Sequence, residues 1–318
     1  MKSHTKPNAA TLPVVRVESL TKRYDDHVAV DSLSFEVPTG QVIGLLGPNG
    51  AGKTTAMKMI VGLVKPTSGR AELLGVSSDE PAFGHALRRV GSLIESPALY
   101  RNLSARQNLH LQAKALGVEA TPSLVDELLE LVDLADRADD RARSYSLGMK
   151  QRLGIAVAMV GKPELIILDE PANGLDPAGI VEIRRLLRRL PEMGTTVLVS
   201  SHQLNEVQKA ADSLVVLDRG RLIACGTTDE IIGSQTSASF QIRLAPDELS
   251  SAIAALSAHG VAATTESVDQ LSVTLADGWR GRDLNRLLAE VGVYADQIVH
   301  NTVSLEEAFL AMTQGAHQ

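Results

Sequence analysis

Residues 41–54 have the sequence QVIGLLGPNGAGKT, in which a short apolar run leads directly into a glycine-rich loop. The run is typical of a strand buried on both faces, and the loop Gly47 to Thr54 fits the pattern G-x-x-x-x-G-K-S/T. In this pattern the glycines let backbone N–H groups turn toward phosphate oxygens. Residues 51–64 are predicted to form a helix, whose N-terminus adds positive partial charge beside the loop. The stretch therefore predicts a phosphate-binding strand–loop–helix unit.

This loop supplies the first candidate binding residues. Lys53 is expected to reach the terminal phosphates of a nucleotide, and the Thr54 hydroxyl is expected to bind Mg²⁺. A glycine-rich turn with a chance lysine is the alternative, and the position between a strand and a helix argues against it. The candidate nucleotide-binding residues of this segment are Gly47, Pro48, Asn49, Gly50, Ala51, Gly52, Lys53, Thr54 and Thr55.

A second apolar run ends in two carboxylates. Residues 164–171, ELIILDEP, predict another buried strand. Asp169 is expected to hold the Mg²⁺ shell. Glu170 follows it and points the other way on a strand, so it is a candidate general base for an attacking water. An apolar strand ending in Asp-Glu also occurs in structural roles, but a phosphate-binding loop in the same chain favours catalysis.

A third segment predicts a second anion site far along the chain. Residues 145–152, YSLGMKQR, precede an apolar helix. Ser146 is a candidate N-cap, which is its simplest interpretation. The Ser146 hydroxyl, the Gly148 amide and a helix N-terminus together also suit a γ-phosphate.

The hydrophobic pattern divides the chain into two α/β parts. Strands and helices alternate through residues 12–232, with a predicted helical insertion at about 81–148. Residues 239–314 predict a smaller α+β domain in the ferredoxin-like order β-α-β-β-α-β, with a last helix at SLEEAFLAMT. The polar residues 1–11 are predicted to be disordered.

Composition limits the classes of function. The 318 residues carry a net charge of −7, which argues against nonspecific nucleic-acid binding. The first residues lack the apolar run of a secretory signal. The longest apolar run, Ile155 to Val160, is far shorter than a bilayer crossing requires, so the chain is not expected to cross a membrane alone. A single cysteine excludes a disulfide framework within the chain, and Cys225 is expected to be buried.

The order of these motifs resembles the ATP-binding subunits of ABC transporters over about residues 14–230. Gly47 to Thr54 resembles the Walker A loop of that family, and Asp169 with Glu170 resembles Walker B and the catalytic glutamate. Ser146 and Gly148 keep two positions of the LSGGQ signature, whereas Leu147 and Met149 depart from it. Further matches are Tyr24 at the position of the aromatic that stacks on adenine, Asn173 to Asp176 at the D-loop, and Ser201 with His202 at the switch histidine.

The resemblance implies a P-loop NTPase fold of the ABC type, hydrolysis of ATP with Mg²⁺, and catalytic roles for Lys53, Glu170 and His202. It also implies a head-to-tail dimer, in which each ATP lies between the P-loop of one copy and the Ser146–Gly148 turn of the other. The other implied partner is an integral membrane permease, so that the chain would lie at the cytoplasmic side of the plasma membrane. The tail is similar to those of drug, peptide and polysaccharide export ATPases, which resemble ABC-2 exporters, and a glutamate at position 95 is similar to that of the exporters of bacitracin and lantibiotic-type peptides.

One departure concerns the metal site. Glu95 occupies a position where the family usually has glutamine, and the resemblance implies a place near Mg²⁺ for it. A carboxylate binds Mg²⁺ more strongly than an amide, so Glu95 is a third candidate metal ligand beside Thr54 and Asp169. It either tunes the coupling of hydrolysis to transport or simply performs the role of the glutamine.

Two other classes of function stay open. A soluble ABC ATPase acting on ribosomes or nucleic acid resembles tandem or coiled-coil-split cassettes, whereas this acidic chain has one P-loop and no long heptad run. An ATP-dependent regulatory module would need neither Glu170 nor His202. Tyr24 can also be strand-edge packing, and a lone histidine such as His202 is often structural. The tail is expected to stabilise or regulate a dimer, although fold alone does not assign function.

Overall fold

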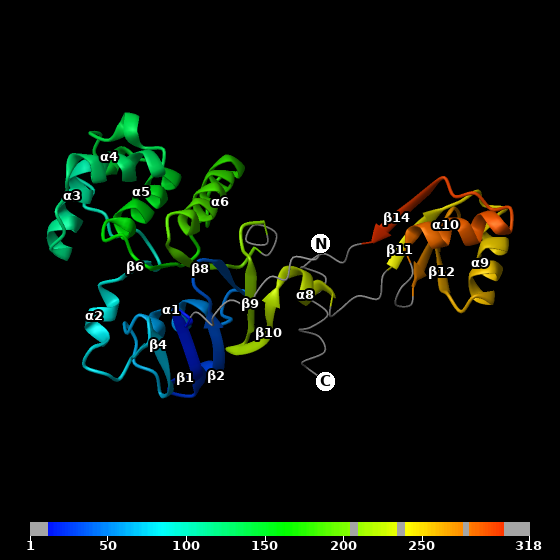
Figure 1. The fold of residues 1–318 in the computed structure, drawn as a ribbon, viewed down its shortest axis with the longest axis horizontal. Helices are drawn as coiled ribbons and strands as arrows, with labels where there is room; N and C mark the ends of the chain where they lie inside the picture. Colours follow the sequence, from blue (N-terminus) through cyan, green and yellow to red (C-terminus); the bar gives the residue numbers. More distant parts are fainter. Residues whose placement is uncertain (1–11, 204–208, 234–238, 276–279, 302–318) are drawn as a thin grey trace, which may run out of the picture. The chain divides into compact units, whose positions relative to one another are not determined.

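The computed structural model describes residues 12–203, 209–233, 239–275 and 280–301 (Figure 1). The chain divides into two compact units, with the boundary between Thr228 and Asp229, a few residues before the predicted domain end at 232. Each unit is described by itself. The segment predicted to be disordered, 1–11, and the helix predicted at SLEEAFLAMT lie outside the described residues.

The first unit is built on a six-stranded sheet in the order β10-β9-β3-β8-β7-β6. Neighbouring strands of this sheet are parallel except for the β9–β10 hairpin, which is antiparallel. Every residue of β3, β7 and β8 is buried, which explains the continuous apolar runs of β3 and β7 and the apolar centre of β8. The strands are β3 (Val42–Leu46), β6 (Val90–Leu93), β7 (Leu165–Leu168), β8 (Thr196–Ser201), β9 (Ser213–Asp218) and β10 (Arg221–Thr227).

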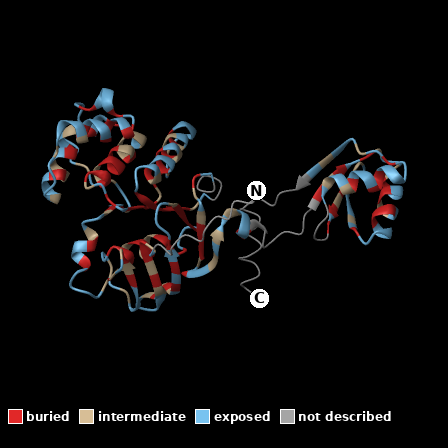
Figure 2. Ribbon diagram, in the orientation of Figure 1, coloured by how far each residue is buried: buried red, intermediate tan, exposed pale blue. Residues whose placement is uncertain are grey.

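A second sheet of the first unit is antiparallel, in the order β2-β1-β4-β5. Burial alternates along much of β1 and β2, which matches the period-2 pattern of a sheet with one face on a core. One core contains apolar residues of both sheets and of α1, as the buried positions in Figure 2 show. The strands are β1 (Val15–Tyr24), β2 (His27–Val37), β4 (Ser68–Leu73) and β5 (Val76–Ser77).

The helices of the first unit include a lobe in which α3, α4 and α5 contact one another (Figure 1). Ser104 and Thr121 cap α3 and α4 with their side chains, as expected for these residue types at helix starts. Two short 3₁₀ turns, Ala135–Arg137 and Ala142–Ser144, lead into α5. The α-helices are α1 (Lys53–Ile60), α2 (Phe83–Leu87), α3 (Ala105–Leu116), α4 (Pro122–Leu131), α5 (Leu147–Met159) and α6 (Pro177–Glu192).

Three sequence expectations differ from the structure. The helix predicted at 51–64 is α1 only, because Gly52 and Gly62 adopt left-handed backbone conformations on either side of it. The insertion predicted as helical from 81 contains β6, a strand of the main sheet that is too short to give a clear period. Cys225, expected to be buried, is exposed because β10 is an edge strand.

The second unit contains a four-stranded antiparallel sheet in the order β12-β13-β11-β14. With α9 and α10 it follows the predicted β-α-β-β-α-β order, and its apolar core is formed by the sheet and both helices. A short helix α8 (Thr228–Gly233) precedes it at the boundary. The elements are β11 (Ser239–Arg243), α9 (Leu249–Ala258), β12 (Ala262–Ser267), β13 (Gln270–Thr274), α10 (Gly281–Glu290) and β14 (Gln297–Asn301).

Candidate functional site

Three groups of predicted site residues meet at the carboxyl ends of parallel strands in the first unit. The P-loop follows β3, Asp169 and Glu170 follow β7, and His202 follows β8. Because β3, β8 and β7 are neighbours in the sheet, their ends bring these segments to one edge. In open α/β sheets this edge is where ligands bind.

The conformation of the P-loop depends on glycine at defined positions. Gly50 and Gly52 have φ values of +84° and +97°, which residues with a side chain rarely adopt. A Cβ atom on Gly47 would lie 2.3 Å from the carbonyl oxygen of Leu217. Gly52 is also the N-cap of α1, and it offers no side chain to the first N–H groups of the helix. These amides are therefore available to an anion.

Lys53 lies inside the loop rather than in solvent. Its side chain is 6% exposed, and its ammonium donates hydrogen bonds to the carbonyl oxygens of Gly47 at 2.7 Å and Pro48 at 3.2 Å. The ammonium also lies 3.2 Å from Oε1 of Glu170. The cation thus satisfies carbonyls and a carboxylate of its own chain, and phosphate oxygens would compete for the same donors.

Asp169 is the centre of a buried polar network, with 3% of the residue exposed. Its Oδ2 accepts a hydrogen bond from Oγ1 of Thr54 at 2.8 Å, and its Oδ1 accepts one from Oγ of Ser200 at 2.6 Å. Its own N–H donates to the carbonyl of Leu93 at 2.8 Å. Both carboxylate oxygens of Asp169 are therefore fixed, and Thr54 is held against one of them.

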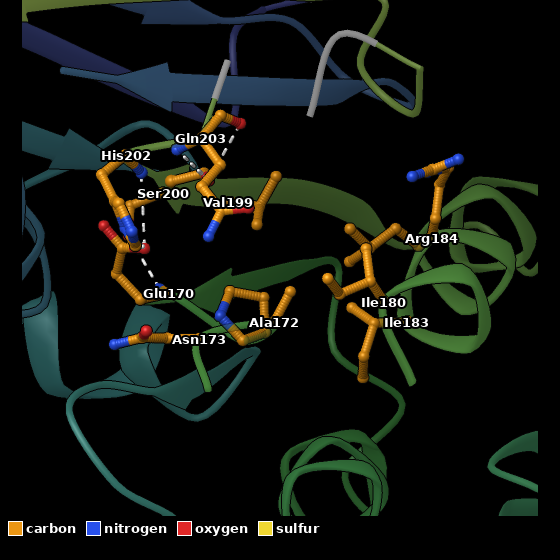
Figure 3. Close-up of a pocket in the computed structure, with 13 residues that line it drawn as sticks. Glu170, Ala172, Asn173, Ile180, Ile183, Arg184, Val199, Ser200, His202 and Gln203 are labelled. Atoms are coloured by element: carbon orange, nitrogen blue, oxygen red, sulfur yellow. Dashed lines mark hydrogen bonds and ion pairs between the residues drawn. The ribbon is translucent and has the colours of Figure 1, made fainter. Parts of the chain in front are cut away.

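Glu170 connects the lysine, the histidine and the strand ends. Its backbone is left-handed, with φ +50°, and its N–H donates to Oγ of Ser200 at 2.9 Å. Figure 3 shows its carboxylate turned toward His202, whose Nδ1 lies 2.7 Å from Oε2. Because the other carboxylate oxygen faces Lys53, Glu170 is held between two partners in a defined position.

The cavity in Figure 3 lies beside this cluster and is a separate feature. Its volume is about 20 Å³, which is room for roughly one water molecule. Glu170, Ser200 and His202 line one part of it, while Ile180 and Ile183 of α6 line another. Its lining contains no P-loop residue, so it is distinct from the predicted nucleotide site.

Tyr24 lies beside the P-loop. It is 46% exposed and lines a pocket of about 340 Å³ with residues 49–55 of the loop. His27 and Ala29 complete the lining, so the start of β2 also contributes. Nζ of Lys22 lies 4.9 Å from the centroid of the Tyr24 ring, a cation–π distance. An exposed aromatic face next to a phosphate loop suits a nucleobase.

Ser146 and Gly148 form a different pocket, of about 300 Å³, whose lining shares no residue with the P-loop pocket. The Ser146 hydroxyl caps α5 and accepts a hydrogen bond from the N–H of Met149 at 3.2 Å. Residues 174–176 and the start of α6 also line the pocket, and Asp176 caps that helix. Two capped helix starts therefore meet here, apart from the P-loop within one copy of the chain.

Glu95 does not contact Thr54 or Asp169 in the described residues. It lies just after β6 with φ +70°, its side chain is 65% exposed, and its Oε1 lies 2.5 Å from Nζ of Lys58. The hydrogen bond to Glu95 raises the pKa of Lys58 above its ordinary value, against the effect of burial. The predicted third metal ligand is therefore engaged by a lysine of α1 in this structure.

Two residues of this region were not predicted from the sequence. Ser200 holds both Asp169 and Glu170, and its only sequence signal was its place one residue before the Ser201–His202 pair. Lys58 follows Thr54 by four residues on α1, a spacing that puts the two side chains on one helix face. Neither signal separates these residues from ordinary strand and helix positions.

The oxygen ligands present suit a Mg²⁺ ion that is bound partly by phosphate. Within the part of the chain that the structure describes, no three His, Cys, Asp or Glu side chains converge as a metal cage. Mg²⁺ is usually bound by one or two protein oxygens together with water and substrate phosphates. The buried Asp169 and the half-buried Thr54 at the P-loop match that ligand chemistry.

The fold and this arrangement define a P-loop NTPase. The family model described as ABC transporter matches residues 30–173. The chain is 38% identical over 304 residues to YhcH, an uncharacterised ABC transporter ATP-binding protein of Bacillus subtilis strain 168, covering 94% of this chain and 96% of that protein. It is 48% identical over 212 residues to the bacitracin transport ATP-binding protein BcrA of Enterococcus faecalis, covering 66% and 68%.

A solved structure, an ATP-binding subunit of an ABC transporter, superimposes with a TM-score of 0.61 at 32% identity, covering 70% of this chain and 93% of that one. The chain therefore belongs to the ABC transporter family of ATP-binding proteins, and it is an ATPase of that family. This confirms the family and the fold class predicted from the motifs. Among the described residues, no helix is both long and apolar enough to cross a bilayer.

Proposed function

We propose that the chain is the ATP-hydrolysing subunit of an exporter and that it acts on a separate membrane permease at the cytoplasmic side of the plasma membrane. The contacts of Glu170 with Lys53 and His202, next to the Thr54–Asp169 pair, carry the catalytic part of the proposal. The export part is supported by the 48% identity to a bacitracin transport protein.

In this proposal the P-loop amides and Lys53 bind the phosphates, and Tyr24 stacks on the adenine. Thr54 and Asp169 hold Mg²⁺, which when bound supplies positive charge to the phosphate oxygens. Glu170 takes a proton from the attacking water, and His202 positions the Glu170 carboxylate. The contacts that Lys53 and Glu170 make with each other would be exchanged for contacts with the phosphate and the water.

Two copies are proposed to form two composite sites. The Ser146–Gly148 pocket is separate from the P-loop pocket in one chain, and two helix starts meet in it, which suits the phosphate of an ATP on a second copy. In a head-to-tail pair with two-fold symmetry, the P-loop pocket of each copy faces the Ser146–Gly148 pocket of the other, so that two sites form.

The composite site is tested by mixing two variants, Lys53→Met and Ser146→Arg, each inactive alone. An equal mixture should regain about a quarter of the wild-type activity, because half of the pairs would contain one intact site. A mixture as inactive as its components would count against the composite site.

The permease is proposed to dock on a groove between the sheet and the helical lobe. This groove, of about 300 Å³, is lined by polar and apolar residues, and the apolar ones include Leu63, Leu99, Leu116 and Val157. Leu63 at its rim is 66% exposed, which suits contact with an apolar partner. The groove lies beside the segment that follows β6 and carries Glu95, so a bound permease would be linked to the hydrolytic site.

The test is affinity purification of the tagged chain from detergent-solubilised native membranes. A polytopic membrane protein should be recovered at about equal stoichiometry, and Leu63→Glu should reduce its recovery while ATP binding is kept. The control is Met193→Glu, since Met193 is also an exposed apolar residue but lies outside the groove. Recovery of ribosomes, or of no membrane protein, would contradict the transport role and leave the ATPase chemistry intact.

A further inference from the structure

The ion pair between Lys58 and Glu95 adds a feature to this site that the motif matches do not contain. Lys58 lies in the last turn of α1, four residues after Thr54. Its ammonium contacts the Glu95 carboxylate at 2.5 Å. Residues four apart on a helix are neighbours on one face. The contact with Lys58 therefore holds Glu95 against α1 at a position one helical turn from Thr54.

The backbone at Glu95 brings the carboxylate into the same region. Leu93, two residues earlier, accepts the N–H of Asp169 through its carbonyl, so the segment after β6 is anchored to the end of β7. Glu95 itself has a left-handed backbone with φ +70°. Side-chain-bearing residues hold this conformation only where surrounding contacts support it. Lys58 is the side chain that contacts Glu95 here.

We propose that Lys58 is a positioning residue that holds the Glu95 carboxylate away from Thr54 and Asp169 when no nucleotide is bound. The inference rests on the proposed function, because it assigns the resting state of the same site. At position 95, where the family usually has a neutral glutamine, this chain has a carboxylate whose negative charge is balanced by the positive charge of Lys58. Without Lys58, the Glu95 carboxylate would be free to approach those of Asp169 and Glu170, where its negative charge would repel the phosphates of ATP.

The test is a double-mutant cycle read by ATP binding in the absence of Mg²⁺, measured by calorimetry with EDTA present. Lys58→Met should weaken ATP binding by about three- to tenfold, since the released carboxylate acts at short range in a partly buried site. Glu95→Gln should change binding by less than about twofold in the wild-type background, yet restore most of the loss in Lys58→Met. The control, Lys114→Met, removes an exposed charge from α3 and should leave binding within about twofold.

Equal effects of Glu95→Gln in both backgrounds would mean that the two charges act independently, and this result would overturn the proposal. If Lys58→Met does not fold, as judged by urea unfolding, the cycle is repeated with Lys58→Gln, for which the same two outcomes apply. If the wild-type chain did not bind ATP at all, the result would instead contradict the proposed function. The two failures are therefore distinguishable.

Discussion

Ser200 is the residue whose removal follows most directly from the contacts of the site. Ser200 is fully buried. Its hydroxyl donates a hydrogen bond to Asp169 at 2.6 Å and accepts one from the N–H of Glu170 at 2.9 Å. Ser200→Ala removes a hydrogen bond to a carboxylate and leaves a backbone N–H without that acceptor. Because a hydrogen bond to a charged group and an unsatisfied buried donor each cost a few kcal/mol, the free energy of unfolding should fall by about 2–4 kcal/mol.

The same substitution should reduce kcat by about 10- to 100-fold, because Asp169 and Glu170 lose the group that fixes both of them. The assays are urea unfolding and steady-state ATP hydrolysis, and Ser200→Thr, which keeps the hydroxyl, should recover part of both losses. Ser144→Ala is the control, since that exposed hydroxyl makes one hydrogen bond to a backbone carbonyl, and its loss should cost under about 0.5 kcal/mol. A stability change that small for Ser200→Ala, with unchanged kcat, would show that Ser200 does not hold Asp169 and Glu170 in place.

Three further substitutions follow from the structure. Gly52→Ala should abolish ATP binding and destabilise the fold by about 2 kcal/mol or more, because Gly52 has φ +97° and the new Cβ would lie 2.5 Å from the Ala29 carbonyl oxygen. The control is Gly194→Ala, since Gly194 has φ +86° but no atom within 4 Å of the new Cβ. Its urea unfolding therefore measures the backbone strain alone. Tyr24→Ala should raise the KM for ATP by about tenfold with little change in kcat, whereas Tyr24→Phe, which keeps the ring, should stay near wild type. Burial raises the pKa of Tyr145 above its ordinary value of 10.0, and its hydroxyl donates a hydrogen bond to the Arg137 carbonyl at 2.6 Å. The folded state therefore favours the neutral phenol, so the contribution of Tyr145 to the free energy of unfolding should be present below pH 10 and lost above it. In urea unfolding the wild type should lose stability between pH 9 and 11 more steeply than Tyr145→Phe does, and parallel curves would exclude this cause.

The sequence predicts those parts of the site in which one short segment carries both its structure and its chemistry. The P-loop needs its glycines and lysine at fixed spacing, and the strand before Asp169 is apolar throughout, so both were visible as patterns. Contacts between distant segments were not visible. Ser200 acts on residues some thirty positions earlier, and Lys58 acts on Glu95, which belongs to another element. The role of a polar residue in such contacts depends on the sheet order.

The fold shows the same distinction. The fully buried strands β3 and β7 were predicted from continuous apolar runs, whereas β6, with the sequence VGSL, is too short and too mixed for a pattern. The end of α1 is set by Gly62 in a left-handed conformation, which competes with the apolar residues that follow it. The exposure of Cys225 follows from the place of β10 at the sheet edge, which composition does not predict.

The catalytic role of Glu170 is tested by comparing the kcat for ATP hydrolysis of the wild type and of Glu170→Gln, with ATP affinity measured on the same samples. The amide keeps the size of the side chain and a contact with His202, so ATP binding should stay within about threefold, while kcat should fall by at least about 100-fold because the general base is lost. Hydrolysis by Glu170→Gln at the wild-type rate would contradict the assignment of this carboxylate.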